Sequence, residues 1–263
     1  GVDTFTYTVR SDSGAAAAVV TIDVSGQTVW FVDDSAAAGG DGSFGAPFNS
    51  LTLVNGSSGV GDVDAAGETI FVYAGTYSVE FDLEPGQQLI GEANGLDLVG
   101  TGNDVAPGTR PTLNAASTFP IIEFFGANGT VRGFNINSTA GMALQGASVS
   151  NVTVAQVTVT ANAGSNNAIL LNGSAGTNTF DNFNITGAAG TGNAIFLLSN
   201  SGTINFVGST VSGFTGGYVL NINGNSGTIN FDSNSDLTSS NTRGLTIQTQ
   251  AATGVVNLAG VDL

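Results

Sequence analysis

The feature that most constrains this chain is an internal repeat with a period of about 26 residues, within the range typical of solenoids. Four segments share a pattern: GTNTFDNFNITG (176–187), GTINFVGSTVSG (202–213), GTINFDSNSDLTS (227–239) and GVVNLAGVDL (254–263). Their opening glycines, Gly176, Gly202, Gly227 and Gly254, are almost evenly spaced. Extended towards the N-terminus, the register gives one apolar position in six repeats: Val131, Val154, Phe180, Phe206, Phe231 and Leu258. A nearly fixed period of this length predicts a solenoid.

A second series of apolar segments lies between the first ones. These segments are GMALQG, NAILLNG, NAIFLLSN, GYVLNING and GLTIQTQ. One residue of each segment lies about one period from the corresponding residue of the next: Met142, Ile169, Ile195, Val219 and Leu245. Within the first series, apolar residues also follow three and five positions later, as in Val131, Phe134 and Ile136. Phe206 keeps only Val211, and Phe231 slips to Leu237. This spacing predicts two short strands joined by a bend.

The repeat therefore predicts an all-β fold, a single-stranded parallel β-helix with coils of about 26 residues. Coils of this kind stack about 4.8 Å apart, so that identical side chains fill one continuous core. Asn at the turns accepts left-handed backbone angles and pairs amide to amide along the stack. The alternative is a β-sandwich of short strands, which gives no reason for a repeat of nearly constant length.

Composition and charge exclude several classes of function. The 263 residues contain no His and no Cys, which excludes disulfides, thiolate zinc sites and Ser-His-Asp or Cys-His nucleophiles. The net charge is −16, and the four basic residues are all arginines, so nucleic-acid binding is not expected. No apolar run is long enough for a membrane-spanning helix. The chain begins at Gly1 without a signal-like segment, which favours a processed product or an excised piece of a longer chain.

The charge is divided unevenly along the chain. Residues 1–104 hold 15 of the 20 acidic residues and one arginine, a net charge of −14, whereas residues 105–263 carry −2. The second part contains 22 Asn and few helix-forming residues, so almost no helix is expected after residue 60. The chain is thus predicted to have an acidic head and a nearly neutral body.

Residues 1–26 predict a β-hairpin. Phe5, Tyr7 and Val9 alternate on one strand, and Val20, Ile22 and Val24 alternate on the next, around a Ser/Asp/Gly turn. The segment resembles the closing hairpin of the cadherin-like or Ig-like modules of large bacterial surface proteins, with a D-x-F-T-Y-T-V strand followed by a V-T-I-x-V strand. An isolated hairpin is marginal in water. We therefore expect it to pack on the solenoid, on the rest of a truncated module or on a neighbouring subunit, and so to be the remnant of such a module or an assembly strand.

Residues 27–263 are assigned to the β-helix, with a cap and leading segment at 27–60 and coils at 61–263. The strings VWFVDDSAAAGGDGSFGAPFNSL, GETIFVYAGTY and LEPGQQLIGE resemble the first segment of right-handed parallel β-helix proteins of the pectate-lyase-like superfamily. Ala74 stands where Pro is common in that family. Combined with the hairpin, the arrangement resembles the β-helix regions of bacterial adhesins and filament proteins.

Catalytic residues of the family are not matched in the coils. Pectate lyases use an Arg or Lys beside calcium-binding carboxylates, whereas Arg132 and Arg243 have no acidic residues at the same position of adjacent coils. Asp181, Asp232 and Asp236 are scattered singly. We therefore predict no enzymatic activity, and we assign no catalytic residue, cofactor site or metal site.

Some residues of the acidic head are candidate ligand-binding or metal-binding residues. Glu80, Asp82 and Glu84 alternate with apolar residues, which predicts one outer acidic face, with a calcium site as the alternative to a solvated face. Asp33, Asp34 and Asp41 in a Gly-rich loop are a second oxygen-rich candidate site, and we prefer turn and cap roles for them. Asp62 and Asp64, also in a Gly-rich loop, are expected to be solubilising. For the aromatic residues Trp30, Tyr73 and Tyr77, core or cap packing is preferred to the alternative of stacking on sugar rings.

These observations predict a noncatalytic, extracellular structural or adhesive module of a bacterial cell surface. It would act as a rigid stalk or as a self-assembling filament subunit. Its expected partners are neighbouring domains of the same large protein or identical subunits, with a surface glycan as a further candidate. The alternative function is a polysaccharide-binding or polysaccharide-processing β-helix protein.

Overall fold

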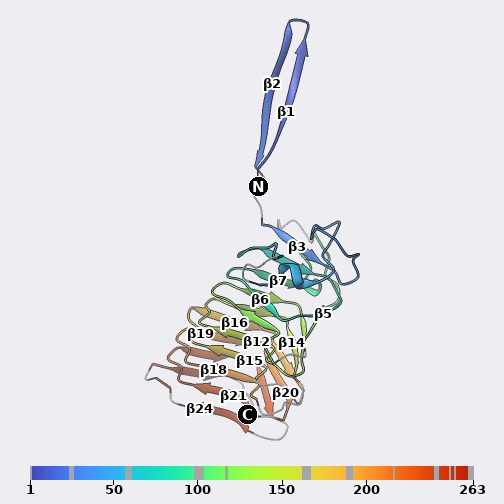
Figure 1. Ribbon diagram of the computed structural model, residues 1–263. Helices are drawn as coiled ribbons and strands as arrows, with labels where there is room; N and C mark the ends of the chain where they lie inside the picture. The colour runs from blue at the N-terminus through green and yellow to red at the C-terminus, as the bar shows by residue number, and fades with distance from the viewer. Residues whose placement is uncertain are drawn as a thin grey trace.

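The computed structural model describes residues 2–23, 27–56, 61–97, 104–115, 118–161, 167–187, 192–215, 217–239, 243–248, 250–251 and 253–259. Within these ranges the chain is almost entirely β, with two short 3-10 helices, Leu51–Val54 and Glu92–Asn94. Figure 1 shows a stack of coils that runs from β3 to the C-terminal strands. The predicted all-β parallel β-helix is confirmed.

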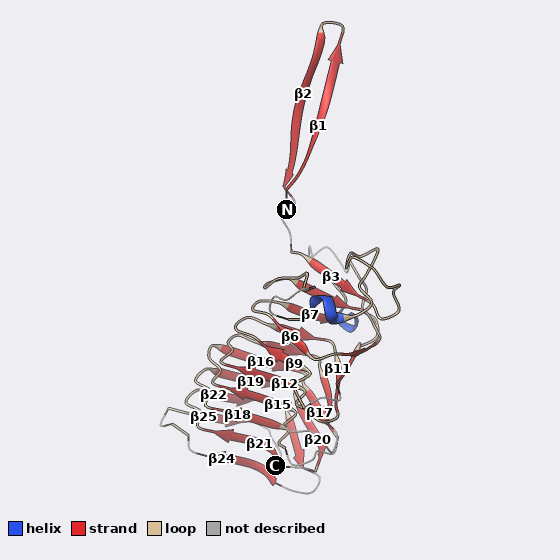
Figure 2. Cartoon of the chain, viewed as in Figure 1, coloured by secondary structure: helices blue, strands red, loops and turns tan. Residues whose placement is uncertain are grey.

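The stack is built from three parallel sheets (Figure 2). Sheet 1 contains, in the order in which neighbouring strands pair, β3 (Val29–Val32), β4 (Thr69–Val72), β7 (Gln88–Gly91), β10 (Thr130–Arg132), β13 (Thr153–Ala155), β16 (Thr177–Asp181), β19 (Thr203–Val207), β22 (Thr228–Phe231) and β25 (Val255–Leu258). Sheet 2 contains β5 (Thr76–Ser78), β8 (Thr112–Ala115), β11 (Asn135–Ser138), β14 (Thr158–Ala161), β17 (Asn184–Thr186), β20 (Thr210–Phe214) and β23 (Asp236–Ser239). Sheet 3 contains β6 (Phe81–Leu83), β9 (Ile122–Phe124), β12 (Leu144–Ala147), β15 (Ile169–Asn172), β18 (Ile195–Leu198), β21 (Tyr218–Asn223) and β24 (Arg243–Gln248).

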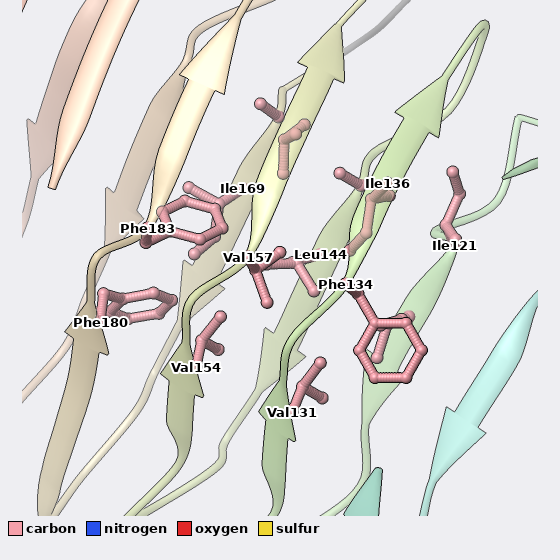
Figure 3. Close-up of a cluster of buried hydrophobic side chains, with 14 of the residues drawn as sticks. Ile121, Val131, Phe134, Ile136, Leu144, Val154, Val157, Ile169, Phe180 and Phe183 are labelled. Atoms are coloured by element: carbon pink, nitrogen blue, oxygen red, sulfur yellow. The ribbon is translucent and has the colours of Figure 1, made fainter. Parts of the chain in front are cut away.

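The first apolar series forms one column inside sheet 1. Neighbouring strands pair Val131 with Val154, and the same register continues through Phe180, Phe206, Phe231 and Leu258. The rings of Phe206 and Phe231 stack with centroids 4.4 Å apart, and those of Phe180 and Phe206 lie 4.9 Å apart. Figure 3 shows the earlier part of this column beside the other core side chains. The predicted shared core is therefore confirmed.

The predicted bend follows this column two positions later. Gly133, Gln156, Asn182 and Gly208 occupy this position and all have positive φ, between 50° and 80°. The next residue turns inward: Phe134, Val157 and Phe183 are fully buried there. In the following coils Ser209 and then Ser235 replace the apolar side chain, and each accepts a hydrogen bond from the backbone N–H of the coil before it, at 3.3 and 3.2 Å. Buried serines therefore occupy the inward position at this bend in the coils that have no apolar residue there.

The second apolar series is only partly in the predicted register. Ile169 pairs with Ile195 as expected, but their partners are Leu144 and Leu220, so the prediction is wrong by two positions at Met142 and by one at Val219. The loops between sheets 2 and 3 differ in length from coil to coil, which shifts the strand register relative to a fixed period. Val219 instead lies in the buried position before Leu220.

Asparagine ladders form as predicted. Buried Asn200 accepts a hydrogen bond from the Ser174 N–H at 2.8 Å, and Asn225 accepts one from the Asn200 N–H at 2.7 Å. On the outer face of sheet 1, the amide of Asn230 donates to Asn205 at 2.8 Å. These bonds satisfy turn and surface groups from one coil to the next.

The leading segment covers the end of the core beside β3. Phe48 pairs with β3 by donating its backbone N–H to the Phe31 carbonyl and accepting from the Asp33 N–H, and its ring stacks on Trp30 at 5.8 Å. The 3-10 helix that follows buries Leu51 and Val54. These side chains join the main core cluster at this end. At the other end, Val261 and Leu263 of the last repeat lie outside the described residues.

The predicted hairpin is also present. β1 (Val2–Ser11) pairs antiparallel with β2 (Gly14–Asp23), with Phe5 opposite Val20. Phe5 and Tyr7 remain about half exposed, at 51% and 48%. Residues 24–26, including Val24, lie outside the described residues.

Candidate functional site

The acidic face predicted on residues 80–84 is formed by β6. Phe81 and Leu83 are completely buried, so Asp82 between them faces outward with Glu80 and Glu84 on either side. The backbone N–H of Asp82 donates to Asn55 Oδ1 at 2.8 Å, and the Asn55 amide donates to the Glu80 carbonyl at 2.7 Å. The strand alternation predicted from sequence is confirmed, and the cap segment fixes its position.

A fourth carboxylate, which sequence reasoning missed, joins this face. Glu123 is the direct register partner of Asp82 on β9, one strand spacing away. Burial, and then the charge of Glu80, raises the pKa of Asp82. Burial and the charge of Asp82 raise the pKa of Glu123, against a hydrogen bond from Gln145 at 3.2 Å. The two carboxylates form an acidic pair on the outer face of sheet 3.

The column that contains this pair includes an apolar stretch in the middle of the stack and is polar again beyond it, at Asn221 and Thr246. Asp82 and Glu123 are followed in register by Gln145, Leu170 and Phe196. Leu170 and Phe196 are half-buried and face outward. Acidic, amide and apolar groups therefore lie in one line on an open sheet face.

A second acidic group lies between the cap and the first coils. The fully buried Gln87 donates a hydrogen bond to Asp64. Burial, and then the neighbouring carboxyl group of Asp62 through hydrogen bonding and its negative charge, raise the pKa of Asp64 to about 8. Burial and the charges of Asp62 and Glu68 raise the pKa of Glu84. The Asp64 carboxyl group therefore keeps its proton at neutral pH. The solubilising role expected for these residues is incomplete, because both side chains are partly buried in this contact.

The three acids of the leading loop, Asp33, Asp34 and Asp41, fix the loop and its turns. Asp33 accepts hydrogen bonds from the N–H and hydroxyl of Ser35, at 2.9 and 2.7 Å. Asp41 accepts one from the Ser43 N–H at 3.0 Å, and the Ser43 hydrogen bonds lower the pKa of Asp41. Asp34 accepts one from the Thr76 N–H at 2.8 Å and so joins the leading loop to the first coil. The predicted turn and cap roles are confirmed.

The aromatic residues of the head pack as predicted. Trp30 donates its indole N–H to Glu68 at 2.6 Å. Tyr77 is buried, and its hydroxyl donates to the Tyr73 carbonyl at 3.0 Å and accepts from the Asp34 N–H at 3.1 Å. Burial raises the pKa of Tyr77 above its usual value. These rings are structural parts of the cap and the adjacent coil.

The arginine and aspartate residues of the body remain separate in the described part of the chain. Arg132 lies in register with Ile90 and Ala155, and Asp181 with Ala155 and Val207. Asp232 caps a turn by accepting from Ser235 Oγ at 2.7 Å, and Asp236 pairs with Thr210. Arg243 begins β24. Arg132 and Asp181 therefore lie in one column with Ala155 between them, and no described strand pairs Arg132 directly with an acid.

A metal-binding group of acids and a membrane-spanning helix are both absent from the ranges that the structure describes. Within them, no three acidic side chains are arranged to hold a common metal ion. No helix in these ranges is long and apolar enough to cross a membrane.

Comparisons with known proteins add the following findings. No protein-family model and no curated protein sequence matches the chain. A solved structure described as a rhamnogalacturonan lyase is similar to it, with a TM-score of 0.42 and 10% sequence identity. The alignment covers 88% of this chain and 87% of that chain.

Proposed function

We propose that this chain is a noncatalytic structural module of a bacterial cell surface, which acts as a rigid stalk or as a filament subunit outside the cell. The observation that carries the proposal is the single core cluster that runs without interruption from Val32 to Leu237. Each coil contributes buried side chains to this cluster, so no coil can unfold without exposing the apolar side chains of the adjacent coil. Nine strands at about 4.8 Å spacing give a rod of about 38 Å.

The hydrogen bonds between coils give the module its mechanical role. In each sheet they run along the rod axis and join every strand to its neighbours. The buried serine and asparagine ladders add further bonds in the same direction. Such a stack would hold whatever adjoins it at a fixed distance and would resist proteolysis. Its partners would be neighbouring domains of the same protein or identical subunits.

A stretching experiment tests the proposal. Attached through residues 27 and 259, the β-helix should unfold in one or two cooperative steps at high force, because each coil is bonded to both neighbours. Gradual extension at low force, coil after coil, would contradict a rigid role.

The filament variant assigns the hairpin to assembly. An exposed hairpin can add its edge to another sheet. Deletion of residues 1–26 should leave a folded β-helix that no longer assembles. Unchanged assembly after the deletion would exclude this variant.

A second candidate function is polysaccharide binding or processing. The pair Asp82 and Glu123, followed along the same column by Leu170 and Phe196, favours it. Glycan arrays with and without calcium test it, with Glu123→Gln as the variant that removes the pair. Binding that depends on Glu123 would support this candidate, whereas no binding under either condition would exclude it.

A further inference from the structure

A second, smaller apolar cluster covers the outer face of sheet 1 at its acidic end. Phe31, Phe71 and Ile90 are register partners on β3, β4 and β7, and they point away from the main core. Leu96 completes this cluster and is also buried. Aromatic rings dominate it: Phe31 and Phe71 lie 5.9 Å apart, centroid to centroid.

A cavity of about 350 Å³ opens beside this cluster. It is lined by Phe31, Phe44, Leu96, Asp104 and Val105, and we call it the Phe31–Phe44 pocket. The rings of Phe31 and Phe44 meet edge to face, with centroids 5.4 Å apart and planes at 80°, so they form two perpendicular walls. Reciprocal backbone hydrogen bonds between Leu96 and Val105, at 2.8 and 3.0 Å, hold the opposite wall. The volume is within the range of sites that take a small ligand or a side chain.

The pocket combines ring faces with negative charge. Phe44 is 62% exposed, so one ring is available to a ligand without rearrangement of the core. Asp104 is the one charged residue among the described residues of the lining. Residues 1–104 carry a net charge of −14 and contain no lysine. The negative potential reaches the rings: after burial, the charges of Glu92 and Asp33 raise the pKa of Tyr73, which packs on Phe31 at 6.3 Å.

This chemistry selects one class of ligand. A ring face attracts a cation within about 6 Å, and more strongly when the cation is partly desolvated. An apolar wall accommodates an alkyl stem whose charged end stays near solvent. A surrounding field of one sign raises the local concentration of oppositely charged ligands. An anionic or purely apolar ligand would use only part of this environment.

We propose that the Phe31–Phe44 pocket binds the side chain of a lysine presented by a basic partner protein, with the alkyl stem along Phe31 and Leu96 and the ammonium group near Phe44 and Asp104. This rests on the proposed surface function and deepens it, because it names the chemistry by which the module would contact a partner. The stalk role rests on the core of the β-helix and not on this pocket, so the stretching experiment and the binding experiment can fail independently.

The test uses n-pentylammonium as the probe and n-pentanol as a neutral probe of the same length. Both are titrated into the full chain, with ring resonances of Phe followed by NMR. We expect the ammonium to shift the resonances of Phe31 and Phe44 and to bind at least tenfold more tightly than the alcohol at low salt. At about 1 M salt, where the Debye length is about 3 Å, the difference should shrink. Equal affinity of the two probes, or no shift with either, would overturn the proposal.

Variants locate the binding in the pocket. Phe44→Ala and Asp104→Asn should each weaken binding of n-pentylammonium severalfold. Phe5→Ala and Asp12→Asn, on the hairpin, are the matched controls and should leave it unchanged. Thermal melting of each variant checks the fold, and Phe44 is exposed enough for its removal to be tolerated. Equal losses in the hairpin variants would show that only the general charge of the chain is sensed, and would also overturn the proposal.

Discussion

Replacement of Phe206 by Ala is the perturbation from which the structure predicts the largest effect of a single truncation. The side chain is 1% exposed, and its ring is stacked between those of Phe180 and Phe231. Truncation of a buried Phe to Ala costs about 3 to 5 kcal/mol, because transfer free energy is lost and a cavity remains. Both ring neighbours also lose a partner here, so we expect a value at the upper end of that range.

The cost can be measured by thermal and urea unfolding. For a domain of this size each kcal/mol lowers Tm by roughly 2 to 4 °C, so the drop should be roughly 6 to 20 °C. Val207→Ala is the matched control, since Val207 is the next residue on β19, faces outward and is 40% exposed. Phe206→Leu should recover much of the loss, whereas Phe206→Asp should abolish the fold by burying an unpaired charge. Equal effects of Phe206→Ala and Val207→Ala would refute the shared column.

Two further predictions concern polar groups. Asn200→Ala should destabilise the protein by about 2 to 4 kcal/mol in urea unfolding, because it leaves Ser174 without its buried acceptor, whereas Asn205→Ala on the outer face should cost less than about 0.5 kcal/mol. Similar costs would contradict a role for the buried ladder. The raised pKa of Asp64 means that the folded state holds the proton more tightly, so its contribution to stability is complete below about pH 4 and is lost as the pH rises to about 8. Asp64→Asn should flatten this decline by about 1 to 2 kcal/mol after solvent screening, while Asp12→Asn should not; an unchanged slope for Asp64→Asn would argue against the raised pKa of Asp64.

The sequence was sufficient to predict the fold because stacking repeats the same chemical requirement in every coil. The column from Val131 to Leu258 could be found from spacing alone, since each coil must place an apolar residue over the last one. The bend could be found in the same way, because the backbone there requires left-handed angles. Loop length between sheets 2 and 3 follows no such requirement, which is why the predicted register is wrong at Met142 and Val219.

The groupings of the head were harder to predict for a related reason. Asp82 and Glu123 are separated in the sequence by well over one period, because the first coils carry an insertion. Only the strand register of the folded chain brings them together. Asp62 and Asp64 are close in sequence, but Asp64 also has partners on a later turn, where Gln87 donates a hydrogen bond to it and the charge of Glu84 contributes to its raised pKa. The Phe31–Phe44 pocket likewise depends on residues from three separated segments.

The most direct test of the stacked core is a nuclear Overhauser measurement on protein labelled only in its Phe rings. With Phe206 assigned by substitution, its ring protons should show cross-peaks to the rings of both Phe180 and Phe231, and those two outer rings should show none to each other. Cross-peaks from Phe206 to neither ring would mean that the coils do not share a core, and the β-helix account would have to be abandoned.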